Sequence, residues 1–439
     1  MKVARWKVVG LAGALALGYV ASADAAQIKV SDETWADFGV RMKMWYLNKD
    51  KRSNSTTNDG WHQNVFDVWL TRVYFVGQIT PLFRFYSHLD TSSYTDGYAT
   101  FSEGGINLAF AKEFQVWVGK IRKPFTRAQL TAGFSQITSQ DYWLDPQNQL
   151  KTIKAALMKC DLGVMIQGDL VDGMFRYRIG AYNEDRSNAT KWWKGDKSIG
   201  WTGFSVAPGK KMNDKKNFEW NARIEFTPTM LGFKPETATL IKPRLYDSYF
   251  GSKDVFTIGL GYHYETHTPK GQFGNQLRSE LKRKGWTVDA MFEKKFGCLV
   301  PNLQVGYINF SDSHYYNKYR WDGTKWDNPY VKKGDSDIWY VTGQLLYDQV
   351  VWLGKPAIAF RYENITGDGE WTDGKIRKKD LTVETYGVAL NYYIKGQAAR
   401  ISVGFDYTKY DDALKRYLKV DRKEEDSITD WYVYFQSQF

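Results

Sequence analysis

Apolar and polar residues alternate one by one over many segments of this 439-residue chain. The first clear example has an apolar face of Phe38, Val40, Met42, Met44 and Tyr46 interleaved with Asp37, Gly39, Arg41, Lys43 and Trp45. The same alternation returns at residues 83–90, 161–167, 175–182, 221–226, 256–265, 286–293, 358–363, 385–392 and 400–407. A period of two is that of a β-strand, whose successive side chains point to opposite faces. The sequence therefore predicts an all-β fold.

The last twelve residues alternate in the same way. Trp431, Val433, Phe435 and Phe439 share one face, and Asp430, Tyr432, Gln436 and Gln438 share the other. Ser437 is a departure, because it lies on the apolar face where an aromatic residue is expected. Soluble proteins rarely end on such a strand, since termini usually fray in water. An outer-membrane barrel needs one, because its last strand pairs with its first and its outer face meets lipid.

Connections between the strands fall into two kinds. Tight turns are expected at residues 171–173, 295–297 and 394–396. Long polar stretches occupy residues 49–60, 184–217, 266–284, 311–335, 367–379 and 411–426. Short turns on one rim and long loops on the other are typical of outer-membrane barrels. We therefore predict one domain, a transmembrane antiparallel β-barrel of about 16 strands.

The amino-terminal residues predict a secretory signal peptide. Lys2, Arg5 and Lys7 precede an apolar run at residues 8–20, and Ala23-Asp24-Ala25 fits the small-x-small cleavage pattern. The alternative is an amino-terminal membrane anchor, but this run is too short to span a bilayer. We expect residues 1–25 to be cleaved after Ala25, which leaves residues 26–439 as the barrel.

Composition is consistent with an exported barrel. Aromatic residues make up 16% of the chain, with 18 Trp and 29 Tyr, which suits girdles at the two membrane interfaces. The mean hydropathy of −0.51 fits alternating lipid-facing and lumen-facing positions. The formal net charge of +11 favours anionic partners, namely solutes or lipid headgroups, since an exported barrel does not meet nucleic acid. Cys160 and Cys298 are the two cysteines, and separate thiols are the simpler interpretation than a disulfide.

Seven short motifs, in order along the chain, resemble those of the phosphate-selective porin O/P family. They are Val118 to Leu130 with Lys123-Pro124-Phe125, Cys160 to Val164 with Gly168, Arg178 to Asn183, Ala222 to Pro228, Phe360 to Glu363, Tyr386 to Tyr393, and Phe435 to Phe439. Glu184 after Asn183, and Ala128-Gln129 where acidic residues are usual, depart from the family pattern. The resemblance implies a homotrimeric outer-membrane anion channel of sixteen-stranded barrels. It also implies an inward-folding constriction loop near residues 123–152.

Cationic side chains facing a narrow lumen are what an anion channel requires, and the planar fork of arginine suits oxyanions. By alternation the inward candidates are Arg41, Lys43, Arg72, Arg84, Arg176, Arg178, Arg223, Arg361 and Arg400. Lys120, Arg122, Lys123 and Arg127 cluster at the segment that the resemblance assigns to the constriction. The competing interpretation is structural ion pairing with the inward carboxylates Asp90, Asp161, Glu225, Asp289, Glu363 and Asp406.

Enzyme and metal chemistry find no support in the sequence. His263 and His267 are four residues apart on a predicted strand, about 13 Å, which is too far for one metal ion. No nucleophile elbow, phosphate loop or zinc spacing occurs, so we expect no cofactor and no enzyme. The expected partners are small anionic solutes, outer-membrane lipid and lipopolysaccharide. The alternatives are a channel for neutral or sugar solutes, suggested by the aromatic excess, and a barrel that sheaths an electron-transfer partner.

Overall fold

The computed structural model describes residues 26–51, 61–91, 99–138, 160–183, 218–236, 245–267, 281–321, 326–372, 376–410 and 427–439. Within these ranges the elements are β1 (Ala26–Lys29), β2 (Trp35–Lys51), β3 (Trp61–Gln78), β4 (Phe83–Thr91), β5 (Thr100–Ala109), β6 (Gln115–Arg122), α2 (Arg127–Leu130), β7 (Cys160–Leu170), β8 (Phe175–Asn183), β9 (Phe218–Phe226), η3 (Thr229–Leu231), β10 (Val255–His267), β11 (Leu281–Glu293), β12 (Leu299–Trp321), β13 (Trp326–Tyr347), β14 (Lys355–Thr372), β15 (Ile376–Lys395), β16 (Ala399–Tyr410) and β17 (Ser427–Gln438). No helix in the described part of the chain is long and apolar enough to cross a membrane.

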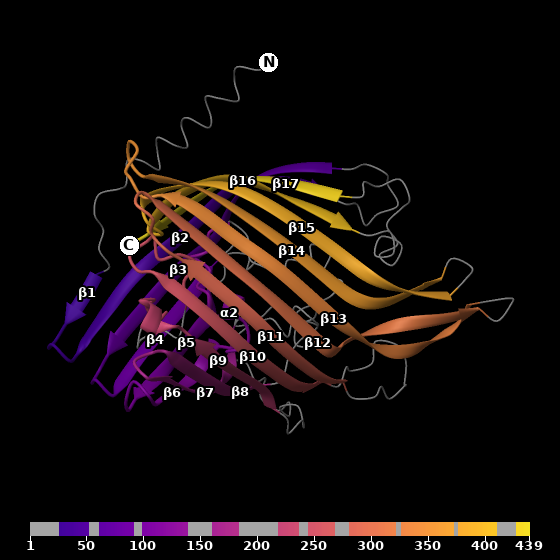
Figure 1. The fold of residues 1–439 in the computed structure, drawn as a ribbon, viewed down its shortest axis with the longest axis horizontal. Coiled ribbons are helices and arrows are strands. Elements are labelled where there is room, and N and C mark those ends of the chain that lie inside the picture. The colour runs from indigo at the N-terminus through magenta and orange to yellow at the C-terminus, as the bar shows by residue number, and fades with distance from the viewer. Residues whose placement is uncertain are drawn as a thin grey trace, which may run out of the picture.

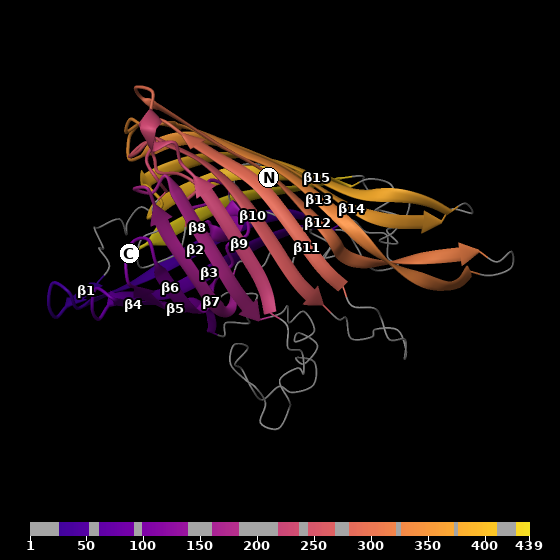
Figure 2. The same ribbon diagram turned by 60° about the horizontal axis from the view of Figure 1, so that its bottom comes forward.

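Strands β2 to β17 form a closed antiparallel ring (Figures 1 and 2). Each strand pairs with the next in sequence, and β17 returns to β2 in a register that runs from Trp431 opposite Asn48 to Gln438 opposite Arg41. The predicted sixteen-stranded barrel is therefore confirmed. The short β1 also pairs with β2, just beyond the end of β17, with Ala26 opposite Phe38.

The outer wall is apolar and the inner wall is mainly polar or charged. On β15, for example, Val388 and Leu390 are exposed on the outside, whereas Ala389 and Asn391, which alternate with them, are buried inside. The carboxyl-terminal strand follows its prediction, because Trp431 is 52% exposed while Tyr432 and Tyr434 are buried. The strands obey the inside-out pattern that a lipid-facing barrel requires.

Connections alternate between two rims. We call the rim with the tight connections at residues 79–82, 110–114, 171–174, 294–298, 348–354 and 396–398 the turn rim, and the opposite one the loop rim. Residues 227–254, between β9 and β10, are the long exception on the turn rim. The turn predictions at residues 171–173, 295–297 and 394–396 each fall on this rim.

Two of the loop predictions are wrong. Most of residues 311–335 belongs to the β12–β13 hairpin, which pairs as far as Trp321 opposite Trp326, and much of residues 367–379 extends β14 and β15. These strands project furthest from the ring (Figure 1). The sequence there is polar at successive positions, so the alternation that marks a half-buried strand is missing.

Candidate channel interior

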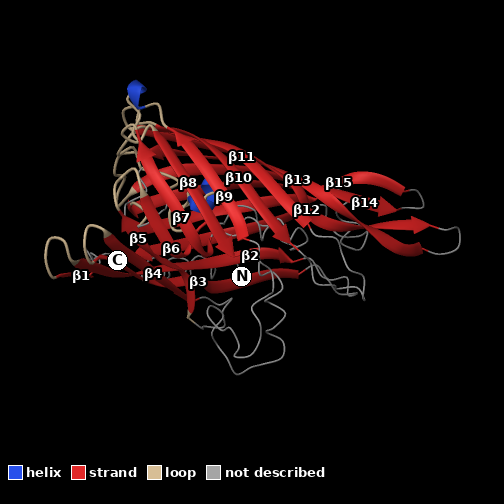
Figure 3. Cartoon of the chain, turned by 90° about the horizontal axis from the view of Figure 1, so that it is seen from below, coloured by secondary structure: helices blue, strands red, loops and turns tan. Residues whose placement is uncertain are grey.

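The segment that follows β6 lies inside the barrel. Pro124 cannot donate to a β-ladder, so the strand ends there and the chain turns inward. Thr126 then caps α2, whose four residues are all buried, and Gln129 completes a capping box with the backbone N–H of Thr126. Figure 3 shows this short helix within the ring of strands. The structure describes this inward segment as far as Thr138; residues 139–152 of the predicted loop lie outside the described residues.

A second segment enters the lumen from the turn rim, and the sequence analysis missed it. Leu245, Asp247 and Ser248 of the β9–β10 connection are buried. Leu245 forms a parallel bridge with Thr131, with backbone bonds of 3.0 Å from Ala132 N–H to the Leu245 carbonyl and from Leu245 N–H to the Leu130 carbonyl. The strands before and after residues 227–254 were both predicted. The unusual length of this connection was therefore the signal in the sequence that could have pointed to a segment inside the lumen.

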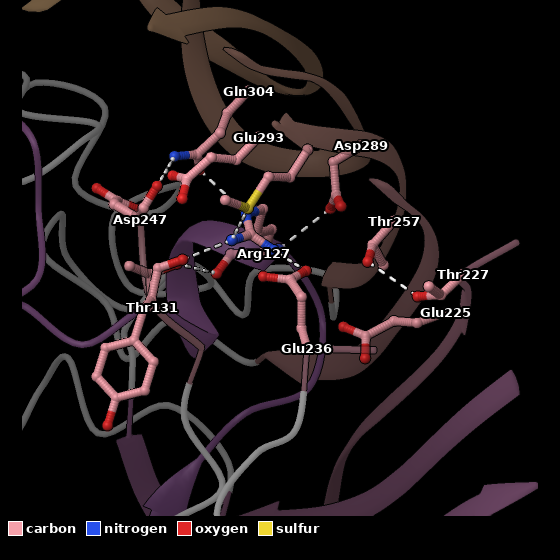
Figure 4. A network of polar contacts seen from close by, with 12 residues as sticks. Arg127, Thr131, Glu225, Thr227, Glu236, Asp247, Thr257, Asp289, Glu293 and Gln304 are labelled. Carbon is pink, nitrogen blue, oxygen red and sulfur yellow. Dashed lines mark hydrogen bonds and ion pairs between the residues drawn. The ribbon is translucent and has the colours of Figure 1, made fainter. Parts of the chain in front are cut away.

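Arg127 is enclosed by polar groups of both segments and the wall (Figure 4). Its guanidinium lies 2.5 Å from a Glu236 carboxylate oxygen and donates to Gln304 Oε1 at 3.0 Å. Its backbone N–H donates to Asp289 Oδ2 at 3.1 Å. With 2% of its surface exposed, Arg127 ties the inward segment to β11, β12 and the turn-rim segment.

The other three cations of the predicted constriction cluster each have different partners. Arg122 donates to the Gln129 and Thr131 carbonyls at 2.6 Å and is ion-paired with Glu103. Lys123 pairs with Glu219 of β9 at 2.9 Å.

Lys120 instead shares the side of β6 that carries Val118, opposite the buried Trp117 and Ile121. Because side chains alternate along a strand, this is the outward side of the barrel wall. Lys120 Nζ donates to the Phe101 carbonyl at 2.7 Å.

The arginines of β8 and β9 form one buried network with carboxylates. Arg223 is paired with Asp289 at 2.6 Å and with Glu225 at 2.8 Å, and Arg178 lies 2.8 Å from Glu225. Arg176 is paired with Asp169 and is 3.8 Å from Glu225. Their charges are balanced within the wall, as the ion-pairing interpretation expects.

Three further candidates on other strands also have polar partners. Arg72 makes a two-pronged contact with Asp90, with both bonds at 2.6 Å. Arg361 lies 3.2 Å from Asp406 and 3.5 Å from Glu363. Arg84, close to the turn rim, donates to Gln78 Oε1 at 2.9 Å.

Three of the candidate cations lie around Phe134 of the inward segment, and Arg400 lies against another aromatic ring. The Phe134 ring centroid lies 5.4 Å from Arg41 Cζ, 4.9 Å from Lys43 Nζ and 5.4 Å from Arg72 Cζ. Arg400 Cζ lies 4.9 Å above the Tyr434 ring. Cations at these distances from ring centroids are attracted by the negative faces of the rings.

Apolar side chains fill other parts of the lumen. Phe125 packs with Ile308, Phe310, Ile338 and Tyr340 of β12 and β13. A second cluster lines β3 to β8 and includes Tyr74, Tyr86, Trp117, Met165 and Tyr182. At the level of the inward segment, the described part of the interior is therefore a packed core.

A second ion-pair network was also missed by the sequence analysis. Lys123 and His263 both contact Glu219, and Arg283 is paired with Glu265. His263 and Glu265 are both buried on the inner face of β10, and alternation along a strand gives no partner for either residue. The described residues include no group of three or more His, Cys, Asp or Glu that could hold a metal ion, and Cys160 and Cys298 are not joined in a disulfide.

The sequence matches no protein-family model and no curated protein. The structure resembles a loop-deletion mutant of OmpT, an outer membrane protein of Vibrio cholerae, with a TM-score of 0.51 and 8% identity over 93% of this chain and 100% of that chain. In-vitro folded OmpT of Vibrio cholerae gives a TM-score of 0.50 and 9% identity, over 94% of this chain and 100% of that one. The anion-selective porin from Comamonas acidovorans matches at a TM-score of 0.47 and 9% identity, over 93% of this chain and 100% of that chain. At these identities the first two likenesses establish the fold of outer-membrane barrels, and the third is too distant to carry an argument about ions.

Proposed function

We propose that this chain is an outer-membrane channel of the porin type that passes small hydrophilic solutes passively, with a preference for oxyanions. The observation that carries the proposal is a closed barrel, apolar outside, whose lumen holds an inward segment surrounded by cationic side chains. Because a barrel wall satisfies every backbone hydrogen bond between strands, it can stand in lipid while enclosing a polar interior.

The ion pairs restrict the candidate anion-binding residues to one part of the wall. Most candidate arginines of β8, β9 and β14 are balanced by carboxylates, so they are poor anion ligands. Arg400 differs, because its contacts in the described structure are a backbone carbonyl and the rings of Tyr393 and Tyr434. The anion preference therefore depends on the wall around Arg400, where β16 and β17 meet β2.

Further parts of the proposal follow from the sequence. Residues 1–25 would direct export and be removed, the barrel would reside in a bacterial outer membrane among lipopolysaccharide, and three copies would assemble. Metal and cofactor chemistry have no part in it.

Purified protein in planar bilayers tests the channel and its selectivity. Under a KCl gradient, the reversal potential should take the sign of anion permeation, and Arg400→Gln should shift it toward zero. A reversal potential of the cation sign contradicts the anion preference, and the absence of any conductance contradicts the channel itself. Liposome swelling with neutral sugars, at a rate above that with salts of small anions, would favour the sugar-channel alternative.

A further inference from the structure

Five consecutive backbone carbonyls of the inward segment each accept a hydrogen bond from a different side chain of the barrel wall. The pairs are Gly133 with Lys43 at 2.7 Å, Phe134 with Gln436 at 3.0 Å, Ser135 with Gln397 at 2.9 Å, Gln136 with Arg400, and Ile137 with Asn391 at 2.8 Å. The donors come from β2, β15, β16, β17 and the turn before β16. We call these five side chains the carbonyl clamp.

Both cations of the clamp lie in one cross-strand row. Arg400 is directly opposite Gln436, and Gln436 is directly opposite Lys43. Both cations also lie against the Tyr434 ring, at 4.9 Å for Arg400 Cζ and 5.2 Å for Lys43 Nζ. A solute at this row would meet both positive charges within two strand spacings, about 10 Å.

The clamp does not need charge to hold the carbonyls. Gln436, Gln397 and Asn391 do the same task with neutral amide groups. Arg400 is only 1% exposed, and no carboxylate contacts it in the described parts of the chain. Burial of a charge that is not offset by an opposite charge is costly, so the charge at this position calls for a ligand other than a peptide carbonyl.

We propose that Lys43 and Arg400 form a latch that an oxyanion opens. A carboxylate or phosphate group reaching the row competes with the carbonyls of Gly133 and Gln136 for the two cations. A full negative charge attracts a buried cation more strongly than a neutral carbonyl dipole does, and the guanidinium fork makes paired hydrogen bonds to an oxyanion. The anion therefore displaces the two carbonyls, and residues 133–137 leave the wall. The inference rests on the proposed function, because the anion must first enter the lumen.

The opposite edge of the inward segment stays attached when the latch opens. Ile137 N–H donates to Asp247 Oδ2 at 3.2 Å, and Ala132 N–H donates to the Leu245 carbonyl at 3.0 Å. Those bonds go to the turn-rim segment and use none of the clamp side chains. The segment can therefore swing as a unit on this second attachment.

Three variants separate charge from hydrogen bonding. The double variant Lys43→Gln with Arg400→Gln keeps amide donors for the carbonyls but removes both charges. The double variant Lys43→Met with Arg400→Met removes donors and charges together. The matched control Asn391→Leu removes a neutral clamp donor and keeps both cations.

Single-channel recording at constant ionic strength, with chloride replaced stepwise by inorganic phosphate, is the test. Wild type should show phosphate-dependent opening, and the Gln pair should stay at low conductance without a phosphate response. The Met pair should be open without phosphate, because each lost hydrogen bond from a charged side chain raises the open-to-closed ratio at least about 10-fold. Asn391→Leu should be more open than wild type and still respond to phosphate. Heat-dependent gel mobility and circular dichroism confirm that each variant has folded.

The latch is refuted if wild type does not respond to phosphate, if the Gln pair responds as wild type does, or if the Met pair keeps wild-type conductance. The reversal potential distinguishes the two failures. A reversal potential of the anion sign without a phosphate response contradicts the latch alone. A reversal potential of the cation sign contradicts the proposed function on which the latch rests.

Discussion

Thr131 and Leu245 pair in a parallel bridge although their segments enter the barrel from opposite rims. The turn-rim partner is in turn fixed to β12, because Asn302 and Gln304 donate to the Asp247 carbonyl at 2.7 and 3.0 Å. With the carbonyl clamp on the other side, a continuous chain of hydrogen bonds crosses the lumen from β16 and β17 to β12. The two inward segments therefore act as a partition.

Asn302→Leu should loosen that partition from the β12 side. The side chain of Asn302 also donates to Glu293 at 2.6 Å, so its loss leaves two buried acceptors without this donor. We expect a loss of about 1–3 kcal/mol in the free energy of unfolding, measured by urea titration in lipid vesicles, together with larger current fluctuations in bilayers. Leu303→Ala is the matched control, since Leu303 is the next residue but lies exposed on the outer wall.

Arg223→Met should be more damaging than the joint removal of charge at Arg223 and Asp289. The single change leaves Asp289 and Glu225 buried without this cation, and broken buried pairs typically cost about 3–5 kcal/mol. Arg223→Met combined with Asp289→Asn should recover part of that loss in the same urea titration. Equal or greater destabilisation by the double variant would show that the charges do not compensate each other.

The architecture was predictable because a lipid-facing barrel imposes a period of two on the sequence. Where Tyr386, Val388 and Leu390 alternate with small or polar residues, the face of each side chain follows directly. The polar part of the β12–β13 hairpin was not predicted as strand, because the alternation stops where polar residues follow one another. Inward direction was correctly expected for Arg223 and Glu225, and several of the carboxylates considered as neutralising groups do form ion pairs.

Partners across the lumen could not be predicted in the same way. Alternation gives the face of a residue but not its height along the barrel or its neighbours from distant strands, so the link from Arg127 to Glu236 was not visible. The assignment of Lys120 to the constriction rested on the family resemblance, which takes no account of strand face. The sequence of the turn-rim segment around Leu245 has no periodicity. The length of the β9–β10 connection was the feature that distinguished it from the other turns.

Val388→Arg tests the orientation of the wall. Val388 lies on the outer face between Tyr386 and Tyr392, two aromatic residues that share its side of β15. An arginine on the lipid face near the bilayer centre should lower the free energy of unfolding by about 2–4 kcal/mol. The control is Val171→Arg in an exposed turn of the turn rim, where the effect should be much smaller. Equal effects at the two sites would contradict a lipid-facing position for Val388.

Asp348 on the turn rim should make stability depend on pH. Hydrogen bonds from Lys295 and Lys355, the latter at 2.5 Å, lower the pKa of Asp348 below its ordinary value. A carboxyl whose pKa is lower in the folded state stabilises the protein above its unfolded pKa, and this contribution disappears as the pH falls through the folded pKa. Asp348→Asn should therefore cost at most about 1 kcal/mol at pH 7, a value typical of accessible ion pairs. The difference from wild type should vanish in strong acid, as measured by urea titration across pH; a difference that persists there would mean that the side chain acts through packing rather than charge.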